Sequence, residues 1–151
     1  MKTLIRIHEL PISINEAWEF FLSPANLKLI TPAYMGFDIT SGNANEKMYP
    51  GIIITYNVKP VLNIPLKWVT EITQVKEPFY FVDNQKLGPY KFWHHQHIFK
   101  EIKNGTEMTD IVNYSAPFGI LGAMVENLFI KKKVEEIFNF RNKKLNYLFD
   151  I

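Results

Sequence analysis

A run of strand-like segments followed by one long helical segment constrains the fold of this 151-residue chain more than any other feature. Five such segments follow one another with turn-forming residues between them, and the last leads through the hairpin signal Asn104-Gly105 into a sixth. They span residues 37–41, 51–58, 66–75, 79–87, 90–102 and 106–114. Consecutive strands with short turns predict an antiparallel meander, because parallel neighbours need a long crossover.

The residues before this run predict one more strand and two short helices. Residues 3–10 alternate loosely between apolar and polar and indicate the first strand. Ser13 to Glu16 is a capping-box sequence that begins a helix, and Ser23-Pro24 begins a second one with proline at its first position. Two short helices directly after a first strand are an unusual arrangement.

From Gly122 onward the apolar residues recur at three- and four-residue spacing, the pattern of a long amphipathic helix. This stripe consists of Val125, Leu128, Phe129, Ile130, Val134, Ile137, Phe138, Arg141, Leu145 and Leu148. Such a helix has roughly 28 residues and is about 40 Å long at its usual rise. A strongly curved sheet can wrap around it without closing fully on it. We therefore expect one α+β domain over residues 1–151, with an internal cavity between sheet and helix.

Composition and charge exclude several classes of function. The net charge is +2 and the basic residues are scattered apart from Lys131-Lys132-Lys133, whereas a nucleic-acid binder usually has a basic face. The chain has no cysteine, which excludes disulfides, thiolate metal sites and a cysteine nucleophile. No apolar run has the length of a membrane span, and Arg6, His8 and Glu9 interrupt the first apolar stretch. We therefore expect a cytoplasmic protein that binds no nucleic acid and does not insert stably into membranes.

Polar side chains occupy strand positions where a closed core would place apolar ones. With the two-residue period of a strand, each segment between Phe79 and Tyr114 places polar and large apolar residues on the same face. These faces carry Phe81, Asp83 and Gln85, then Trp93, His95, His97 and Phe99, and then Met108, Asp110, Val112 and Tyr114. A closed core excludes polar groups that lack a partner, so this face is more typical of a cavity wall.

Over nearly its whole length the chain resembles a bacterial subgroup of the SRPBCC superfamily, also called START-related or birch-pollen-allergen-like. The resemblance is carried by FVDNQKLGPY at residues 81–90, WHHQHIF at 93–99, TDIVNY at 109–114 and PFG at 117–119. It implies the helix-grip fold, in which a curved antiparallel sheet wraps around a long C-terminal helix. It also implies a small hydrophobic or amphipathic ligand (lipid, polyketide or isoprenoid-like) between sheet and helix, and some relatives are polyketide cyclases, hydrolases or lipid carriers.

The sequence leaves three interpretations of the polar residues open. They can form an internal hydrogen-bond network in which Asp83 and Asp110 flank His95 and His97. They can recognise the polar head group of an otherwise apolar ligand, with the aromatic residues supplying buried area. They can be an acid–base site of the cyclase/dehydrase type, in which His95 or His97 works with Asp83 or Asp110, and Tyr114 or the second histidine donates a proton.

The leading hypothesis is that the domain binds a small hydrophobic molecule with a polar end. Its predicted ligand-binding residues are Trp18, Trp68, Phe81, Asp83, Gln85, Trp93, His95, His97, Phe99, Met108, Asp110 and Tyr114. The alternative is a cyclase/dehydrase-type lyase or isomerase, and the third is a protein-interaction module with a vestigial pocket. We expect no cofactor and no metal, because His95 and His97 supply two ligands and no motif fixes a third. An exposed edge strand is compatible with an oligomer, although no residue indicates one.

Overall fold

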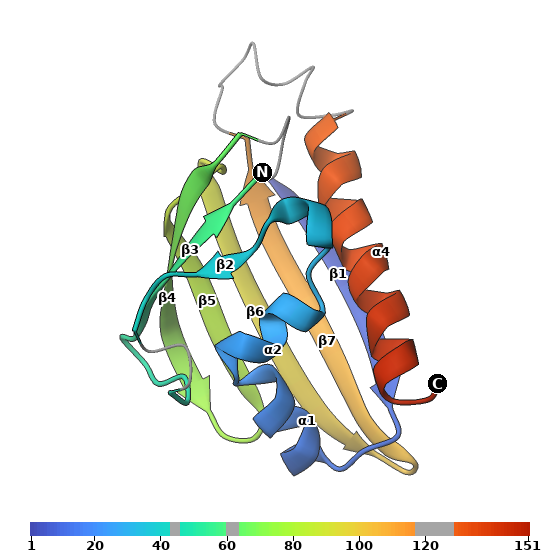
Figure 1. Ribbon diagram of the computed structural model, residues 1–151. Coiled ribbons are helices and arrows are strands. Elements are labelled where there is room, and N and C mark those ends of the chain that lie inside the picture. Colours follow the sequence, from blue (N-terminus) through green and yellow to red (C-terminus); the bar gives the residue numbers. More distant parts are fainter. Residues whose placement is uncertain (43–45, 60–63, 117–128) are drawn as a thin grey trace.

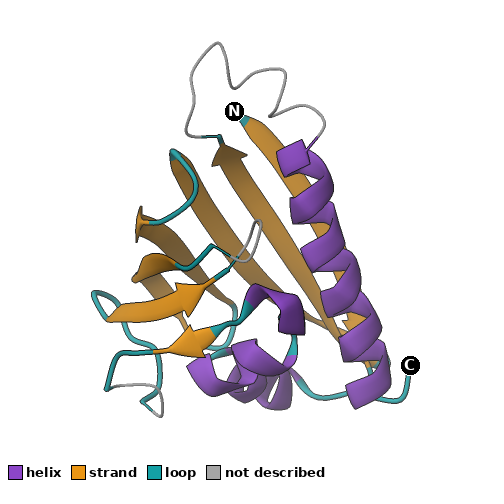
Figure 2. Ribbon diagram, turned by 45° about the horizontal axis from the view of Figure 1, so that its top comes forward, coloured by secondary structure: helices purple, strands orange, loops and turns teal. Residues whose placement is uncertain are grey.

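A computed structural model describes residues 1–42, 46–59, 64–116 and 129–151. In this part of the chain a seven-stranded antiparallel sheet curves around a set of helices (Figure 1). The α-helices are α1 (Ile14–Phe21), α2 (Pro24–Leu29) and α4 (Lys131–Leu148). Figure 2 shows all of them on the same, concave side of the sheet, with α4 beside the short pair.

The strands follow the predicted meander. They are β1 (Lys2–Leu10), β2 (Asp38–Ile39), β3 (Ile53–Val58), β4 (Leu66–Lys76), β5 (Tyr80–Leu87), β6 (Phe92–Ile102) and β7 (Gly105–Ser115). From β2 to β7 each strand pairs with the next, and β1 pairs with β7, so the order is β1-β7-β6-β5-β4-β3-β2. β2 is shorter than the predicted segment 37–41, because only two residues pair with β3.

The capping box predicted at Ser13 begins α1. The Ser13 hydroxyl accepts a hydrogen bond from the backbone N–H of Glu16 (3.3 Å), and the Glu16 carboxylate accepts one from the backbone N–H of Ser13 (2.9 Å). The apolar side of α1 faces the sheet, where Trp18 makes edge contacts with Phe81 and Phe99 at 5.9 and 5.7 Å between ring centroids. After α2, a short 3₁₀ turn, η1 (Ala33–Met35), leads to β2.

The long C-terminal helix buries the middle of the predicted stripe, whereas Phe129 and Leu148 at its two ends are exposed. The buried positions of α4 are Val134, Phe138, Arg141 and Leu145. Arg141 is a cation in an otherwise apolar stripe, and it forms an ion pair with Asp110 of β7. The predicted beginning of this helix before residue 129 and the Pro117–Gly119 motif lie outside the described residues, as do Asn43 and Pro60 of two predicted turns. Among the described helices, none is long and apolar enough to cross a membrane.

The apolar core has two parts. The larger cluster lies between the sheet and the short helices, and it includes Trp18, Phe81 and Phe99. The smaller cluster lies between α4 and strands β1, β6 and β7, and it contains Leu4, Trp93, Val112, Tyr114, Val134 and Phe138. Trp68 of β4 packs against both clusters from a partly buried position. The concave face is therefore not filled by one continuous core.

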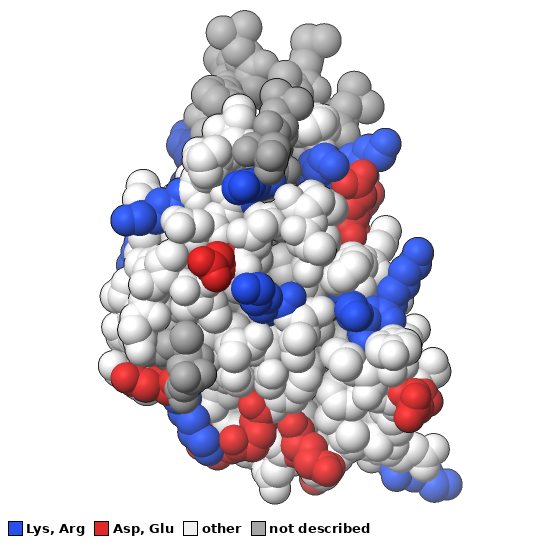
Figure 3. Space-filling model, in the orientation of Figure 1, with Lys and Arg blue, Asp and Glu red and all other residues white. Residues whose placement is uncertain are grey.

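The face of the molecule on which the helices lie carries dispersed charges. In Figure 3 the basic side chains lie apart from one another on a largely uncharged surface, and acidic side chains are more frequent toward the lower end. The ion pair between Lys47 and Glu19 (2.7 Å) is exposed, and such pairs contribute little to stability. On this face, no basic side chains gather into a single patch.

We predict that the tight turn between β6 and β7 tolerates no side chain at Gly105. Gly105 has a φ of +145°, and an added Cβ would collide with the backbone carbonyl of Leu10 at the end of β1. An alanine at this position would strain the backbone and would also place its methyl group against the Leu10 carbonyl. Gly105→Ala should therefore lower the free energy of unfolding by more than about 1 kcal/mol. Urea unfolding followed by tryptophan fluorescence measures this change.

The matched control for this prediction is Gly42→Ala. Among the described residues, no heavy atom lies within 4 Å of a Cβ added at Gly42. A similar loss of stability at Gly42 and Gly105 would contradict the close approach of the turn to β1.

Candidate functional site

The register of β5, β6 and β7 brings the predicted polar residues to one place on the concave face. Asp83 lies opposite His95, and Asp110 lies opposite His97. The pairing of β6 with both neighbours runs without a register shift, so the predicted parity of this strand is correct. His95 and His97 are buried on the inner face, whereas His94 lies on the outer face.

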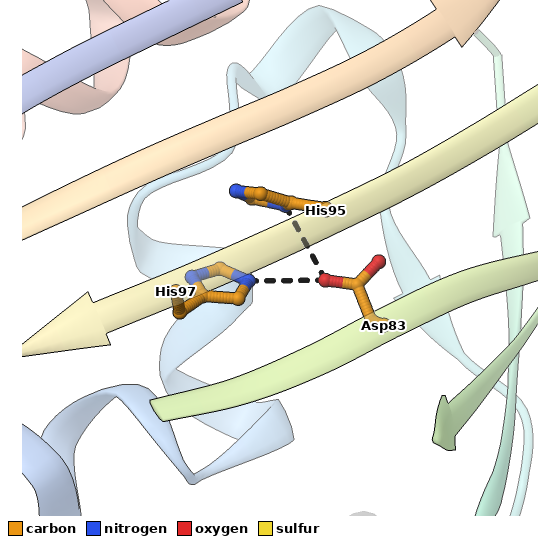
Figure 4. Close-up of side chains that lie close together, drawn as sticks. All are labelled: Asp83, His95 and His97. Carbon is orange, nitrogen blue, oxygen red and sulfur yellow. Dashed lines mark hydrogen bonds and ion pairs between the residues drawn. The ribbon is translucent and has the colours of Figure 1, made fainter. Parts of the chain in front are cut away.

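Both carboxylates contact both imidazole rings. His95 Nε2 lies 2.8 Å from Asp110 Oδ1, and His95 Nδ1 lies 3.3 Å from Asp83 Oδ2. His97 Nε2 lies 3.0 Å from the same Asp83 oxygen, and His97 Nδ1 lies 3.1 Å from Asp110 Oδ1. The two ring centroids are 3.8 Å apart. Figure 4 shows the Asp83 carboxylate directed toward both rings, so the four side chains form one cluster.

Aromatic side chains from both core clusters cover the histidines. Phe81 stacks on His97 with 4.1 Å between ring centroids, and Phe138 of α4 makes an edge contact with His95 at 5.6 Å. Trp93 approaches His95 edge-on at 6.1 Å. The polar cluster therefore lies at the boundary between the two apolar clusters, where little water screens its charges.

Two further residues join the cluster at Asp110. The Arg141 guanidinium lies 3.4 Å from Asp110 Oδ1, and His8 Nε2 of β1 lies 3.6 Å from Asp110 Oδ2. His8 Nδ1 in turn lies 3.1 Å from the side-chain oxygen of Asn142. No sequence pattern singles out His8, which is one isolated histidine on a strand. Arg141 carried a signal, because a cation in a buried helix stripe needs an acidic partner.

The cluster changes the pKa values of its members. Burial alone would raise the pKa of the Asp83 carboxyl, but the charge of His95 and hydrogen bonds from His95 and His97 hold that pKa well below its usual range. Burial would also raise the pKa of Asp110, but the Arg141 charge and the contacts with His8, His95 and His97 hold that pKa well below its ordinary value. Burial would lower the pKa of His95, yet the Asp83 charge and hydrogen bonds to both carboxylates raise it. Both carboxylates are therefore ionised at neutral pH, and His95 holds its proton more firmly than a free histidine does.

A cavity of about 110 Å³ lies beside the cluster. Its polar lining consists of the ionisable residues Asp83, His95, His97 and Arg141 together with Asn26, Thr31 and Thr70. The rest of the lining is mostly apolar and comes largely from α1, α2, η1, β3, β4, β5, β6 and α4, with Phe20, Leu27, Ile30, Met35, Trp68, Phe81, Trp93 and Ile137 among its members. The predicted arrangement of a few convergent polar groups among aromatic and aliphatic side chains is present in this cavity.

The predicted ligand-binding residues divide into two groups. Those that line the cavity are Trp68, Phe81, Asp83, Trp93, His95 and His97. Those outside its lining are Trp18, Gln85, Phe99, Met108, Asp110 and Tyr114.

Packing and hydrogen bonds explain the second group. Trp18, Phe99 and Met108 belong to the larger apolar cluster, and Asp110 lies behind the two imidazole rings, while Tyr114 packs against Trp93. The Gln85 side chain donates a hydrogen bond to the backbone carbonyl of Tyr90 (2.7 Å) and accepts one from its N–H (3.2 Å), so it closes the β5–β6 connection. Strand parity identifies the face on which a residue lies but not its depth along the strand. The apolar lining residues Leu27 of α2 and Ile137 of α4 carried no polar signal in the sequence.

Comparisons with known proteins bear on the fold. No protein-family model matches the chain, and no curated protein is detectably similar to it. Among solved structures, protein CV1439 from Chromobacterium violaceum has a TM-score of 0.75 at 10% identity, with 100% of this chain and 99% of that chain covered. Protein Ms6760 from Mycobacterium smegmatis has a TM-score of 0.70 at 20% identity over 97% and 89% of the two chains. Ara h 8.0201, of the birch-pollen-allergen type, has a TM-score of 0.61 at 11% identity over 95% and 97%.

The chain has the helix-grip fold. The curved antiparallel sheet, the C-terminal helix and the two short helices after the first strand all agree with the prediction. At these identities the likeness extends to the fold alone, so the assignment to the SRPBCC superfamily stays a prediction.

We predict that neutralising Asp110 destabilises the protein strongly. Asp110→Asn keeps the shape of the side chain but leaves the buried Arg141 guanidinium without its counter-charge. Breaking a buried pair in this way typically costs about 3–5 kcal/mol, and we expect the free energy of unfolding to fall by about 3 kcal/mol. Urea unfolding at neutral pH measures the change.

Asp38→Asn provides the matched control. Asp38 pairs with Lys28 at 3.6 Å, but its side chain is 66% exposed, so its loss should leave the stability unchanged within error. If Asp110→Asn is as mild as Asp38→Asn, the ion pair between α4 and β7 does not hold the fold as described.

Proposed function

We propose that this domain binds a small, largely apolar molecule with a polar end in the cavity between the sheet and the helices. The observation that carries the proposal is the composition of the cavity wall, which is mostly apolar and in which the ionisable side chains of Asp83, His95, His97 and Arg141 converge at one place. Small-molecule sites typically combine apolar walls with a few polar groups that fix the orientation of the ligand. The resemblance to the SRPBCC superfamily supports the same function.

The polar wall suggests how the ligand is oriented. The Nε atom of Arg141 is buried and has no hydrogen-bond partner among the described residues, although Arg141 lines the cavity. A buried donor without a partner costs about 1–3 kcal/mol, so a ligand that supplies an acceptor would gain this energy. In the proposed complex an oxygen atom of the ligand therefore lies at this wall, and its apolar body lies toward Leu27 and Ile137.

The volume of the cavity favours a compact ligand. At about 110 Å³ it is smaller than the roughly 300–1,000 Å³ typical of small-molecule pockets. Of the ligand classes implied by the resemblance, a short-chain or single-ring compound fits without rearrangement. A long-chain lipid would require α2 or α4 to move away from the sheet.

The same geometry supports ligand binding more than catalysis. A general base must be able to accept a proton, but His95 lies between two ionised carboxylates that raise its pKa. His95 is therefore better suited to donate hydrogen bonds than to abstract a proton. Cyclase/dehydrase-type chemistry with His95 or His97 and Asp83 or Asp110 stays the alternative, and an interaction module with a vestigial pocket stays the third.

Native mass spectrometry followed by denaturing extraction gives the direct test of ligand binding. We expect protein purified from its own source, or from a lipid-rich host, to carry one small molecule per chain that is released on unfolding. Its mass should correspond to a compact compound. The proposal would be overturned if the purified protein is always empty and also binds no phenol in isothermal titration calorimetry.

We predict that filling the cavity abolishes binding of a compact aromatic alcohol. The substitution Ile137→Trp adds bulk from α4 into the cavity lining, whereas Asn139→Trp adds the same side chain at an exposed position of the same helix. With phenol, a single-ring compound, as the probe, isothermal titration calorimetry should show at least tenfold weaker binding for Ile137→Trp and unchanged binding for Asn139→Trp. Equal binding by both variants would show that the probe does not enter this cavity.

A further inference from the structure

We propose that Asp83, His95 and His97 form a binding site for a divalent transition metal at the polar wall of the cavity. One potential ligand atom from each residue lies within 4.8 Å of the other two. Two imidazoles and one carboxylate are the ligand set of non-haem iron sites, and open zinc sites use similar sets with a free coordination position. Figure 4 shows the three side chains converging from the neighbouring strands β5 and β6.

The distances at this wall match those between neighbouring ligands of one metal ion. Bonds of about 2.1 Å from the metal to nitrogen or oxygen place adjacent ligand atoms about 3.0–3.4 Å apart. Asp83 Oδ2 lies 3.0 Å from His97 Nε2 and 3.3 Å from His95 Nδ1. A metal ion could therefore be bound with small side-chain movements, and the strands that carry the ligands need not change register.

Asp110 supplies the support that metal-binding histidines usually have. It contacts the ring nitrogens that face away from Asp83, at 2.8 Å for His95 Nε2 and 3.1 Å for His97 Nδ1. A carboxylate in this position fixes the orientation of each ring and directs the other nitrogen toward the metal. One oxygen atom of Asp110 serves both rings, so a single buried side chain aligns both metal-binding nitrogens.

The charge and position of the site favour a divalent cation with open coordination positions. A metal ion competes with the proton that His95 holds, because a metal-binding imidazole must be neutral. Once that proton is displaced, the two carboxylates and the Arg141 guanidinium leave one net negative charge in a poorly screened environment, which stabilises the bound cation. Asp83, His95 and His97 all line the cavity, whereas Asp110 does not. The remaining coordination positions therefore face the cavity, where water or the polar end of a ligand can occupy them.

A metal ion at this site differs from the expectation, based on the sequence, that the chain binds no metal. The motif His95-x-His97 supplied two ligands, and no spacing rule identified the third. The fold supplies it, because Asp83 lies directly opposite His95 across the β5–β6 pair. The metal site shares its wall with the proposed ligand cavity, but it does not depend on an organic ligand being bound.

The test uses the full chain without an affinity tag, freed of metal by a chelator and titrated with Zn²⁺ in a calorimeter. We expect one Zn²⁺ per chain for the wild type. Asp83→Asn and His97→Ala should each weaken binding by at least 100-fold. His94→Ala is the matched control, because His94 is on the same strand but faces outward and binds the Asn84 side chain (2.7 Å), so its removal should leave the affinity unchanged.

Two results would overturn the proposal. One is the absence of stoichiometric Zn²⁺ binding by the wild type, and the other is binding that Asp83→Asn and His97→Ala leave unchanged or that His94→Ala weakens equally. If a variant fails to fold, thermal unfolding of the wild type with and without Zn²⁺ decides. A metal that binds only the native state, at a free concentration of 100 times its Kd, adds about 2.7 kcal/mol to the free energy of unfolding and so raises the Tm.

The phenol titration of the metal-free protein separates the two proposals. Binding of phenol without Zn²⁺ binding supports the ligand cavity and overturns the metal site. Binding of Zn²⁺ without phenol binding supports the metal site and overturns the ligand cavity.

Discussion

The buried charge of Asp110 is the constraint on which the rest of this structure depends. Its side chain is 1% exposed, and it meets groups from three other elements: His8 of β1, His95 and His97 of β6, and Arg141 of α4. An unpaired buried carboxylate costs several kcal/mol, so β1, β6 and α4 are stable against β7 only in the arrangement that brings these partners together. A strand shift of two residues or a helix shift of one turn would keep apolar faces buried, but it would separate the charges of this cluster.

The same constraint accounts for the cavity. Arg141 occupies a position in the buried stripe of α4 where an aliphatic side chain would pack against the sheet. The core is consequently divided, with Phe81 in one cluster and Phe138 in the other, and the paired charges lie between them. The ion pair between Arg141 and Asp110 holds α4 to the sheet without filling the space beside it, where the cavity lies. The opening beside His95 and His97 is thus a consequence of how α4 is attached.

Much of the fold follows from local patterns, whereas the site depends on contacts that are distant in the sequence. Turn residues and two-residue alternation predicted the meander and the inward parity of His95 and His97, because both are properties of short segments. The pairing of β1 with β7 and the contact of His8 with Asp110 join residues about 100 positions apart, and no local pattern encodes them. Gln85 had the correct parity, but it binds the backbone of Tyr90 instead of facing the cavity.

The two carboxylates of the cluster have different roles, and their surroundings distinguish them. Asp110 is fully enclosed and is balanced by Arg141, so these two residues account for the attachment of α4 without any ligand. Asp83 is 15% exposed and lines the cavity, and among the described residues its ion pairs are with His95 and His97 alone. A purely structural network would gain little stability from Asp83. Burying its carboxylate costs free energy, and the contacts with His95 and His97 compensate only part of that cost. The position of Asp83 is better explained by what the cavity holds, since a metal ion or a hydrogen-bonding ligand at this wall supplies the compensation that the fold does not require for itself.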